Sequence, residues 1–92
     1  MSLTSEAGWS DEAWEDYQHW RTTNIPIWKT VKALIRHTQQ RPYKGLGRPK
    51  ALQRELKGYW SRRITDEHRL VYRIRGRGCQ QVLEILQCRG HY

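Results

Sequence analysis

The sequence predicts a single α+β domain over residues 1–92, with an N-terminal hairpin of two helices packed on a small antiparallel β-sheet. Three observations lead to this prediction. Apolar residues follow a helical period up to residue 40 and a period of two from residue 59. A chain of 92 residues leaves no room for a second compact domain. Five Trp and five Tyr are more large aromatics than a disordered chain carries.

Two helices are expected in the first forty residues. Ser10 is a typical N-cap with two acids after it, which predicts a helix over 11–22. Pro26 suits a first helical turn, and an apolar stripe at helical spacing follows it, so a second helix is predicted over 26–40. Residues 6–9 form either a short strand or no regular structure.

A loop and three strands are expected in the second half. Two Gly and two Pro mark residues 42–50 as a loop, and residues 51–57 are predicted to form one helical turn. Alternating side chains predict strands over 59–64, 68–74 and 80–88. Such consecutive strands form an antiparallel meander, and the apolar stripe of the helices needs one face of it as a partner.

Positive charge is concentrated in the second half of the chain. Residues 1–40 carry four Lys or Arg against five Asp or Glu, whereas residues 41–92 carry thirteen against four. Cations interleaved with aromatics are typical of a surface that binds phosphates, so a nucleic acid is the preferred partner. An acidic protein partner and a basic surface without a partner are the alternatives. No apolar run is long enough for a membrane span and no signal peptide is visible, so we expect a cytoplasmic protein without membrane contact.

The cysteines do not indicate a metal site. In one extended strand, Cys79 and Cys88 would lie about 30 Å apart, which excludes a disulfide between them and a zinc ion shared with His91. We therefore expect two buried thiols. No Walker loop, HExxH pattern or serine-hydrolase motif occurs, and no carboxylate cluster indicates magnesium. No metal or other cofactor is expected.

Two arginines flank the turn between the first two predicted strands. A two-residue period places Arg63 and Arg69 on one face of the sheet and His68 on the other. Arg89 or His91 would join the two arginines. Such a cluster can cleave RNA without metal, since guanidinium groups stabilise the phosphorane and an imidazole protonates the leaving oxygen. A solvated surface of Arg and His is the alternative.

Four segments resemble one family of small toxins. The run GYWSRRITDEHRLVY at 58–72 and the ending CRGHY at 88–92 closely resemble the signature of the YoeB toxins, the Txe/YoeB group of the RelE/ParE superfamily. Residues 9–17 resemble the first helix of that family, and residues 42–49 resemble its central loop. The resemblance covers nearly the whole chain and implies a RelE-like fold, similar to microbial ribonucleases.

The resemblance also implies a function. The chain would be the toxin of a type II toxin–antitoxin module and a ribosome-dependent endoribonuclease (an mRNA interferase) that cuts mRNA in the A site and inhibits translation. Its partners would be a YefM-like antitoxin, the 70S ribosome, mRNA and a second copy in a homodimer. A ParE-like gyrase inhibitor shares the superfamily fold but leaves the terminal His-Tyr unexplained.

Individual roles follow from the same resemblance. Arg69 would stabilise the phosphate, His91 would be the general acid, and Tyr92 would stack on a base or orient the tail. Arg63 would assist at the phosphate or contact ribosomal RNA. Further RNA or phosphate contacts are assigned to Lys44, Arg48 and Arg89.

Lys50 stands where the family has a catalytic glutamate, the proposed general base. Three alternatives follow. Lys50 is itself the base, since neighbouring cations and removal from water favour a neutral amine. Glu55 is a substitute base. In the third alternative, the protein binds RNA and the ribosome and blocks translation, but cleaves poorly.

Overall fold

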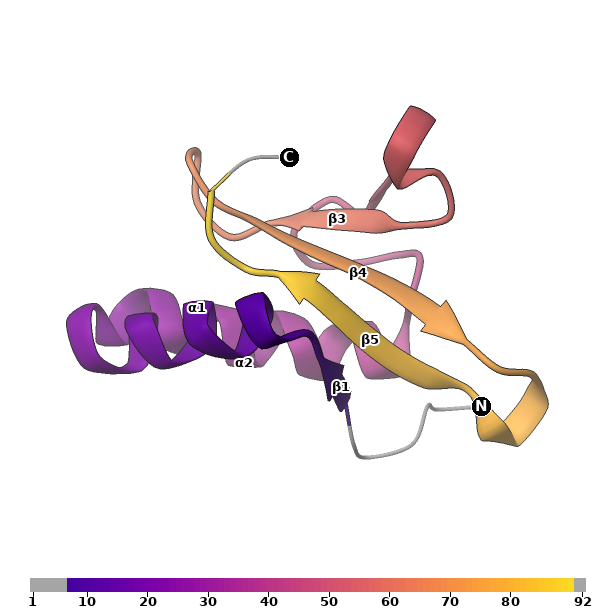
Figure 1. Cartoon of the computed structure of the whole chain (residues 1–92), viewed down its shortest axis with the longest axis horizontal. Helices are drawn as coiled ribbons and strands as arrows, with labels where there is room; N and C mark the ends of the chain where they lie inside the picture. Colours follow the sequence, from indigo (N-terminus) through magenta and orange to yellow (C-terminus); the bar gives the residue numbers. More distant parts are fainter. Residues whose placement is uncertain (1–6, 91–92) are drawn as a thin grey trace.

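The computed structural model describes residues 7–90 and confirms an α+β domain of two helices and a five-stranded sheet (Figure 1). The elements are β1 (Ala7–Trp9), α1 (Asp11–Thr23), α2 (Ile25–Gln40), β2 (Lys50–Ala51), β3 (Trp60–Arg63), β4 (Arg69–Arg75) and β5 (Val82–Gln87), with short 3₁₀ turns η1 (Arg54–Leu56) and η2 (Gly78–Gln80). In the described part of the chain, neither helix is long and apolar enough to cross a membrane.

Both predicted helices are confirmed, and capping side chains explain where they begin. The Ser10 hydroxyl accepts a hydrogen bond from the Ala13 N–H at 3.0 Å and donates to the Leu86 carbonyl at 2.7 Å, which ties the start of α1 to β5. Asn24 ends α1 and caps α2, because its side-chain oxygen accepts from the Ile27 N–H at 3.2 Å. One residue therefore forms the turn of the hairpin.

The sheet is mixed, whereas the sequence predicted an antiparallel one. The strand order is β1-β5-β4-β3-β2, and the central strands β3, β4 and β5 form the expected antiparallel meander. β1 pairs with β5 in parallel, with Ala7 opposite Leu83. Two helices follow β1 before the next strand, so no hairpin sets its direction. The strand alternative for residues 6–9 is confirmed over Ala7–Trp9.

Two predicted boundaries were wrong in the second half. Lys50 and Ala51 pair with β3 as the short strand β2, so only Arg54–Leu56 form the predicted helical turn. A strand of two residues has no alternation that a sequence could reveal. β5 begins at Val82 rather than at residue 80, because η2 occupies Gly78–Gln80.

The core lies between the helices and one face of the sheet. Its buried side chains come from α1 (Ala13, Trp20), α2 (Val31, Leu34), the sheet (Leu70, Tyr72, Leu83, Ile85) and the residues Ile64 and Cys88. No helix covers the opposite face, which we call the open face. It carries the alternate residues of the strands, including Ser61, Arg63, Arg69, Arg73 and Glu84.

Gly47 closes the loop between α2 and β2 against the core. Its φ is 83°, and a Cβ atom at this position would lie 2.8 Å from Leu34 Cδ2 and 3.1 Å from the Arg63 carbonyl oxygen. Both the backbone conformation and the close approach therefore require glycine.

Gly47→Ala should lower the free energy of unfolding by roughly 2–5 kcal/mol, because it adds backbone strain and overpacking. Gly58→Ala is the matched control, since Gly58 also has a positive φ of 97° but no atom within 4 Å of its Cβ position. In the control, the free energy of unfolding should fall only by the cost of the backbone strain, about 1–2 kcal/mol. Urea denaturation followed by circular dichroism measures both, and equal losses would contradict the close packing.

Candidate nucleic-acid interface

Arg62 anchors the loop that leads into the candidate site. This arginine of β3 is fully buried. Its guanidinium donates to the main-chain oxygens of Arg41, Lys44 and Leu46, at 2.9 Å for Lys44 and 2.8 Å for Leu46. Its Nε also donates to the Tyr72 hydroxyl at 3.3 Å. The loop over residues 41–49 is thereby held against β3.

Tyr72 completes this anchor. Burial raises the pKa of the Tyr72 hydroxyl, although the bond from Arg62 partly opposes the shift. The hydroxyl therefore keeps its proton and donates it to the Pro42 carbonyl oxygen at 2.5 Å. The buried Arg62–Tyr72 pair thus binds the loop at both its beginning and its middle.

The strand register brings cations together on the open face. Arg63 of β3 lies directly opposite Arg69 of β4, a position in which Cβ atoms are about 4.5–5.5 Å apart. Lys50 lies opposite Ser61, two residues before Arg63, so it is a diagonal neighbour of Arg63 on the same face. Like charges directly opposite each other destabilise a strand pair, so this arrangement favours a bound anion.

Arg48 also borders these cations. The Gly47 carbonyl oxygen accepts from the Arg63 N–H at 2.7 Å, which places the following residue, Arg48, beside β3. Arg48 has a φ of 52°, a strained conformation for a residue other than glycine. Such strain is concentrated at functional sites. We call Arg48, Lys50, Arg63 and Arg69 the basic cluster.

Neighbouring groups position the basic cluster without neutralising it. Arg63 pairs with Asp66 at 3.6 Å, but the Asp66 side chain is 93% exposed, and such a pair contributes little in water. Arg69 donates through Nη1 to the carbonyl oxygens of Thr65 (2.5 Å) and Asp66 (3.2 Å), which carry no net charge. Within residues 7–90, no three His, Cys, Asp or Glu side chains are placed to hold a metal ion.

The segment before the C-terminus is held by α1. The Cys88 N–H donates to the Asp16 carboxylate at 3.1 Å, and the Cys88 carbonyl accepts from Trp20 Nε1 at 2.9 Å. The Cys88 thiol is buried as predicted, 3.7 Å from the Ala13 carbonyl oxygen. Burial raises its pKa to about 12, so it is an unreactive thiol. The side chain of Cys79 lies outside the described part of the structure.

Gly90 lies beside Arg69. Its carbonyl oxygen accepts from the Arg69 N–H at 3.1 Å, and its N–H donates to His68 Nδ1 at 2.8 Å. The His68 ring packs edge-on against α1 and so points away from the open face, as predicted. The predicted acid His91 and the predicted stacking residue Tyr92 lie outside the described residues, but the residue that precedes them is fixed next to the basic cluster.

Three other predicted residues lie elsewhere. The Arg89 guanidinium lies 6.0 Å from the ring centre of Trp20, on the helix side of the sheet. Lys44 is exposed, but its main chain is held from the helix side by the buried Arg62. Glu55 is exposed in η1, which precedes β3 and so lies at the end of that strand remote from Arg63.

The structure assigns anchoring roles to Arg62 and His68 that the sequence analysis missed. The sequence contains a signal that Arg62 is buried, because it alternates with Trp60 and Ile64, which both contribute to the core. Nothing local points to His68, since its partner Gly90 is 22 residues away in the sequence.

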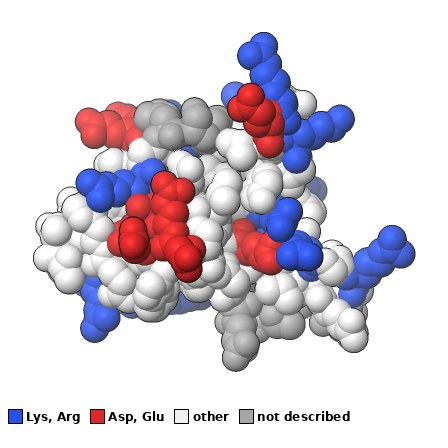
Figure 2. Space-filling model, in the orientation of Figure 1, with Lys and Arg blue, Asp and Glu red and all other residues white. Residues whose placement is uncertain are grey.

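Charge is distributed unevenly over the surface. In the view of Figure 2, an acidic group lies over the start of α1, and basic groups lie around the sheet. The acids at the start of α1 are Asp11 and Glu12, whose negative charges also interact favourably with the helix dipole. Acidic groups also lie among the basic groups of the sheet in this view, and Glu84 pairs there with Arg73 and Arg75.

Solved bacterial toxins share this fold, so the chain has the architecture of a small toxin. It belongs to the family described as YoeB-like toxins of bacterial type II toxin-antitoxin systems, whose model matches residues 9–92. This match confirms the resemblance found in the sequence.

Individual relatives agree with the family match. Toxin YoeB of Escherichia coli K12 is 45% identical over 84 residues, which are 91% of this chain and 95% of that protein. A YoeB/ParE toxin from Agrobacterium tumefaciens is 44% identical over the whole of both chains, with a TM-score of 0.89. In the YoeB-YefM complex from Staphylococcus aureus, the matching chain is 33% identical, with 95% and 97% coverage and a TM-score of 0.84. A YoeB dimer from the same species is 30% identical, with 100% and 98% coverage and a TM-score of 0.80.

The buried carboxylate of Asp16 gives the stability a pH dependence. Burial raises the pKa of Asp16 above its ordinary value, although the Cys88 N–H partly opposes the shift. A raised carboxyl pKa means that folding favours the protonated form, so this contribution to stability is present at low pH and is lost as pH rises through the folded-state pKa.

Asp16→Asn keeps an acceptor for the Cys88 N–H and removes the charge. Relative to this variant, the native protein should gain stability as pH falls from about 7 to about 4.5. Thermal unfolding at both pH values measures the difference in Tm between the native protein and Asp16→Asn. Asp66→Asn, at an exposed carboxylate, is the control and should show no such change. The prediction would be contradicted if the Tm difference between the native protein and Asp16→Asn were the same at both pH values.

Proposed function

We propose that this toxin is a ribosome-dependent endoribonuclease that cuts mRNA in the A site by metal-independent attack of a ribose 2′-OH. One arrangement supports the proposal above all others. Arg63 and Arg69 lie opposite each other on the open face, and Gly90 is hydrogen bonded to the Arg69 main chain. His91, the proposed acid, is the next residue in the sequence after Gly90.

Each residue then has a defined part in the reaction. The 2′ oxygen gives its proton to a base and attacks phosphorus, the bond to the 5′ oxygen breaks, and a 2′,3′-cyclic phosphate and a 5′-hydroxyl result. Arg69, assisted by Arg63, stabilises the phosphorane. His91 protonates the leaving 5′ oxygen. Tyr92 stacks on a base or orients the tail, and Arg48 contacts phosphate at the rim.

The identity of the base depends on Lys50. Geometry favours Lys50 over Glu55, because Lys50 shares the open face with Arg63 and Glu55 lies beyond the other end of β3. Lys50 is also exposed to solvent rather than enclosed in a pocket. This exposure supports a second candidate function, in which the protein occupies the A site and blocks translation while cleaving poorly.

The relatives support two protein partners. A YefM-like antitoxin is proposed because a Staphylococcus aureus relative is solved as a YoeB-YefM complex, and a homodimer is proposed because a YoeB dimer is solved. The 70S ribosome and mRNA are the proposed targets, and the cytoplasm is the proposed location. Arg89, on the helix side, is then better placed for ribosomal RNA than for the cleaved phosphate, and the exposed Lys44 remains a proposed RNA contact.

Mapping of RNA 5′ ends in a purified translation system tests the nuclease. We expect native protein to produce cuts within a codon placed in the A site, and His91→Ala to lower the cleavage rate by about 10²–10⁴-fold, as for loss of a general acid. Arg36→Ala, at an exposed position on α2, is the control and should cleave like the native protein. Stalled translation without any new RNA ends would instead identify a ribosome blocker.

Substitution of Lys50 separates the two candidate functions. Because Lys50 is exposed, we expect Lys50→Glu to raise the single-turnover cleavage rate, by as much as about 10²–10⁴-fold if it restores a general base. A large loss of cleavage in Lys50→Ala would instead make Lys50 the base of the native enzyme. Lys29→Ala removes an equal charge from α2 and should leave the rate unchanged.

A further inference from the structure

Two more arginines of β4 lie on the open face beyond the basic cluster, separated from Arg69 by the buried Val71. Alternation along β4 places Arg69, Arg73 and Arg75 on this face, while Leu70 and Tyr72 lie in the core. At a rise of about 3.3 Å per residue, Arg73 lies roughly 13 Å from Arg69, and Arg75 roughly 7 Å further along. Arg73 and Arg75 are thus two residues apart, whereas four residues separate Arg69 from Arg73.

Glu84 of β5 holds the two outer arginines together. Its carboxylate accepts from Arg73 Nε at 2.7 Å and from Arg75 Nη1 at 3.2 Å. Burial acts to raise the pKa of Glu84, but the bonds from the two guanidinium groups outweigh it and lower the pKa overall. One carboxylate faces two guanidinium groups, so the group keeps a net positive charge. Both arginines remain accessible, with 39% and 62% of their side chains exposed.

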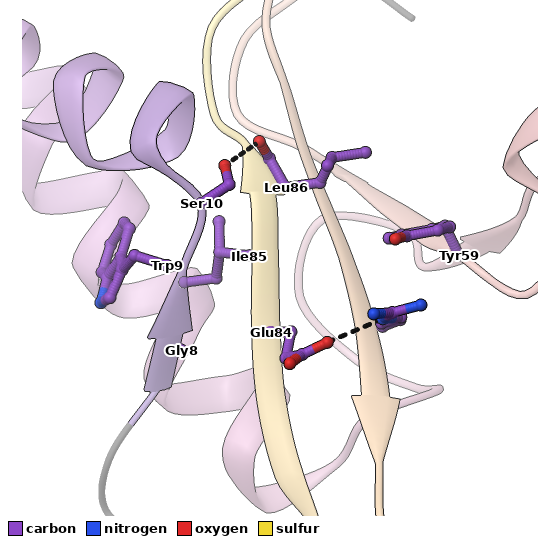
Figure 3. A pocket seen from close by; sticks show the side chains of 8 residues that line it. Gly8, Trp9, Ser10, Tyr59, Glu84, Ile85 and Leu86 are labelled. Atoms are coloured by element: carbon purple, nitrogen blue, oxygen red, sulfur yellow. Dashed lines mark hydrogen bonds and ion pairs between the residues drawn. The ribbon is translucent and has the colours of Figure 1, made fainter.

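A hollow of about 300 Å³ opens beside this group, between Tyr59 on one side and β1 and β5 on the other. Arg73 Cζ lies 5.1 Å from the centre of the Tyr59 ring. Figure 3 shows the Tyr59 hydroxyl directed toward β5 and the Glu84 carboxylate directed toward β4, whereas the Trp9 ring turns away toward the helices. The hollow therefore combines the ring of Tyr59, the guanidinium of Arg73 and the carboxylate of Glu84, and Arg75 adjoins it through its bond to Glu84.

We propose that this hollow is a second nucleotide-binding subsite for a single-stranded RNA that passes through the basic cluster. Arg73 and Arg75 contact phosphates, Tyr59 stacks on a base, and Glu84 accepts a hydrogen bond from an N–H group on the edge of that base. Glu84 would repel an acidic peptide, whereas a base offers it donors, so the chemistry favours RNA over an acidic protein. The subsite rests on the proposed function, because it assumes that the strand at Arg69 is RNA.

Fluorescence anisotropy tests the subsite with a labelled single-stranded RNA of about twelve nucleotides. The double variant Arg73→Gln/Arg75→Gln should reduce the slope of log affinity against log salt by about 1.4, the value for two lost phosphate contacts on a single strand. Arg21→Gln/Arg36→Gln is the matched control, since it removes two exposed arginines of the helices. Its slope should match that of the native protein.

Tyr59 provides a second readout that does not involve charge. Tyr59→Leu should weaken RNA binding roughly tenfold through loss of stacking, and Tyr59→Phe should retain binding. Circular dichroism spectra of all variants verify that each is folded. Equal salt slopes in the two double variants, or equal binding by Tyr59→Leu and Tyr59→Phe, would overturn the subsite. Tighter binding of a labelled oligoglutamate than of RNA would overturn it in favour of an acidic protein.

The anisotropy assay contains no ribosome, so its result separates the subsite from the proposed function. RNA binding with the expected slopes, together with an absence of ribosome-dependent cuts, would refute the nuclease and leave the subsite standing. Ribosome-dependent cuts together with equal slopes would refute the subsite and leave the nuclease standing.

Discussion

The loop beside the basic cluster of this toxin depends on one buried guanidinium. No carboxylate in the described part of the chain pairs with Arg62, so main-chain oxygens and the Tyr72 hydroxyl solvate its charge. A buried charge without such partners costs several kcal/mol, so the loop over residues 41–49 must close in the one conformation that supplies them. Arg63 is the next residue and points to the opposite face. The buried arginine therefore determines where the exposed one lies.

A second constraint joins the first helix to the end of the described chain. Asp16 and Trp20 hold the two main-chain polar groups of Cys88, and His68 and Arg69 hold those of Gly90. The buried Asp16 carboxylate is expensive to ionise, yet it satisfies an N–H group that would otherwise be buried without a partner. The end of the described chain is therefore held from both sides, by α1 through Cys88 and by the start of β4 through Gly90.

The features predicted correctly from the sequence are those set by local rules. The helices begin where Ser10 and Asn24 cap them, and Arg63 meets Arg69 because a period of two continues across a tight turn. β1 has three residues and β2 has two, so neither is long enough to show an alternation that predicts a strand. In the sequence, Arg89 resembles the other cations, and only its contact with Trp20 places it on the helix side. The roles of His91 and Tyr92 stay predictions.

The parallel pairing of β1 with β5 affects how the chain can fold during synthesis. β5 lies between β1 and β4, and the cap of α1 bonds a carbonyl 76 residues later in the chain. The sheet, the first helix and the anchored tail therefore cannot assemble until residues near the C-terminus have left the ribosome. Folds with such non-local contacts also form slowly. The ribosome that makes this toxin thus releases it before its sheet is complete, which gives an antitoxin time to meet an incomplete fold.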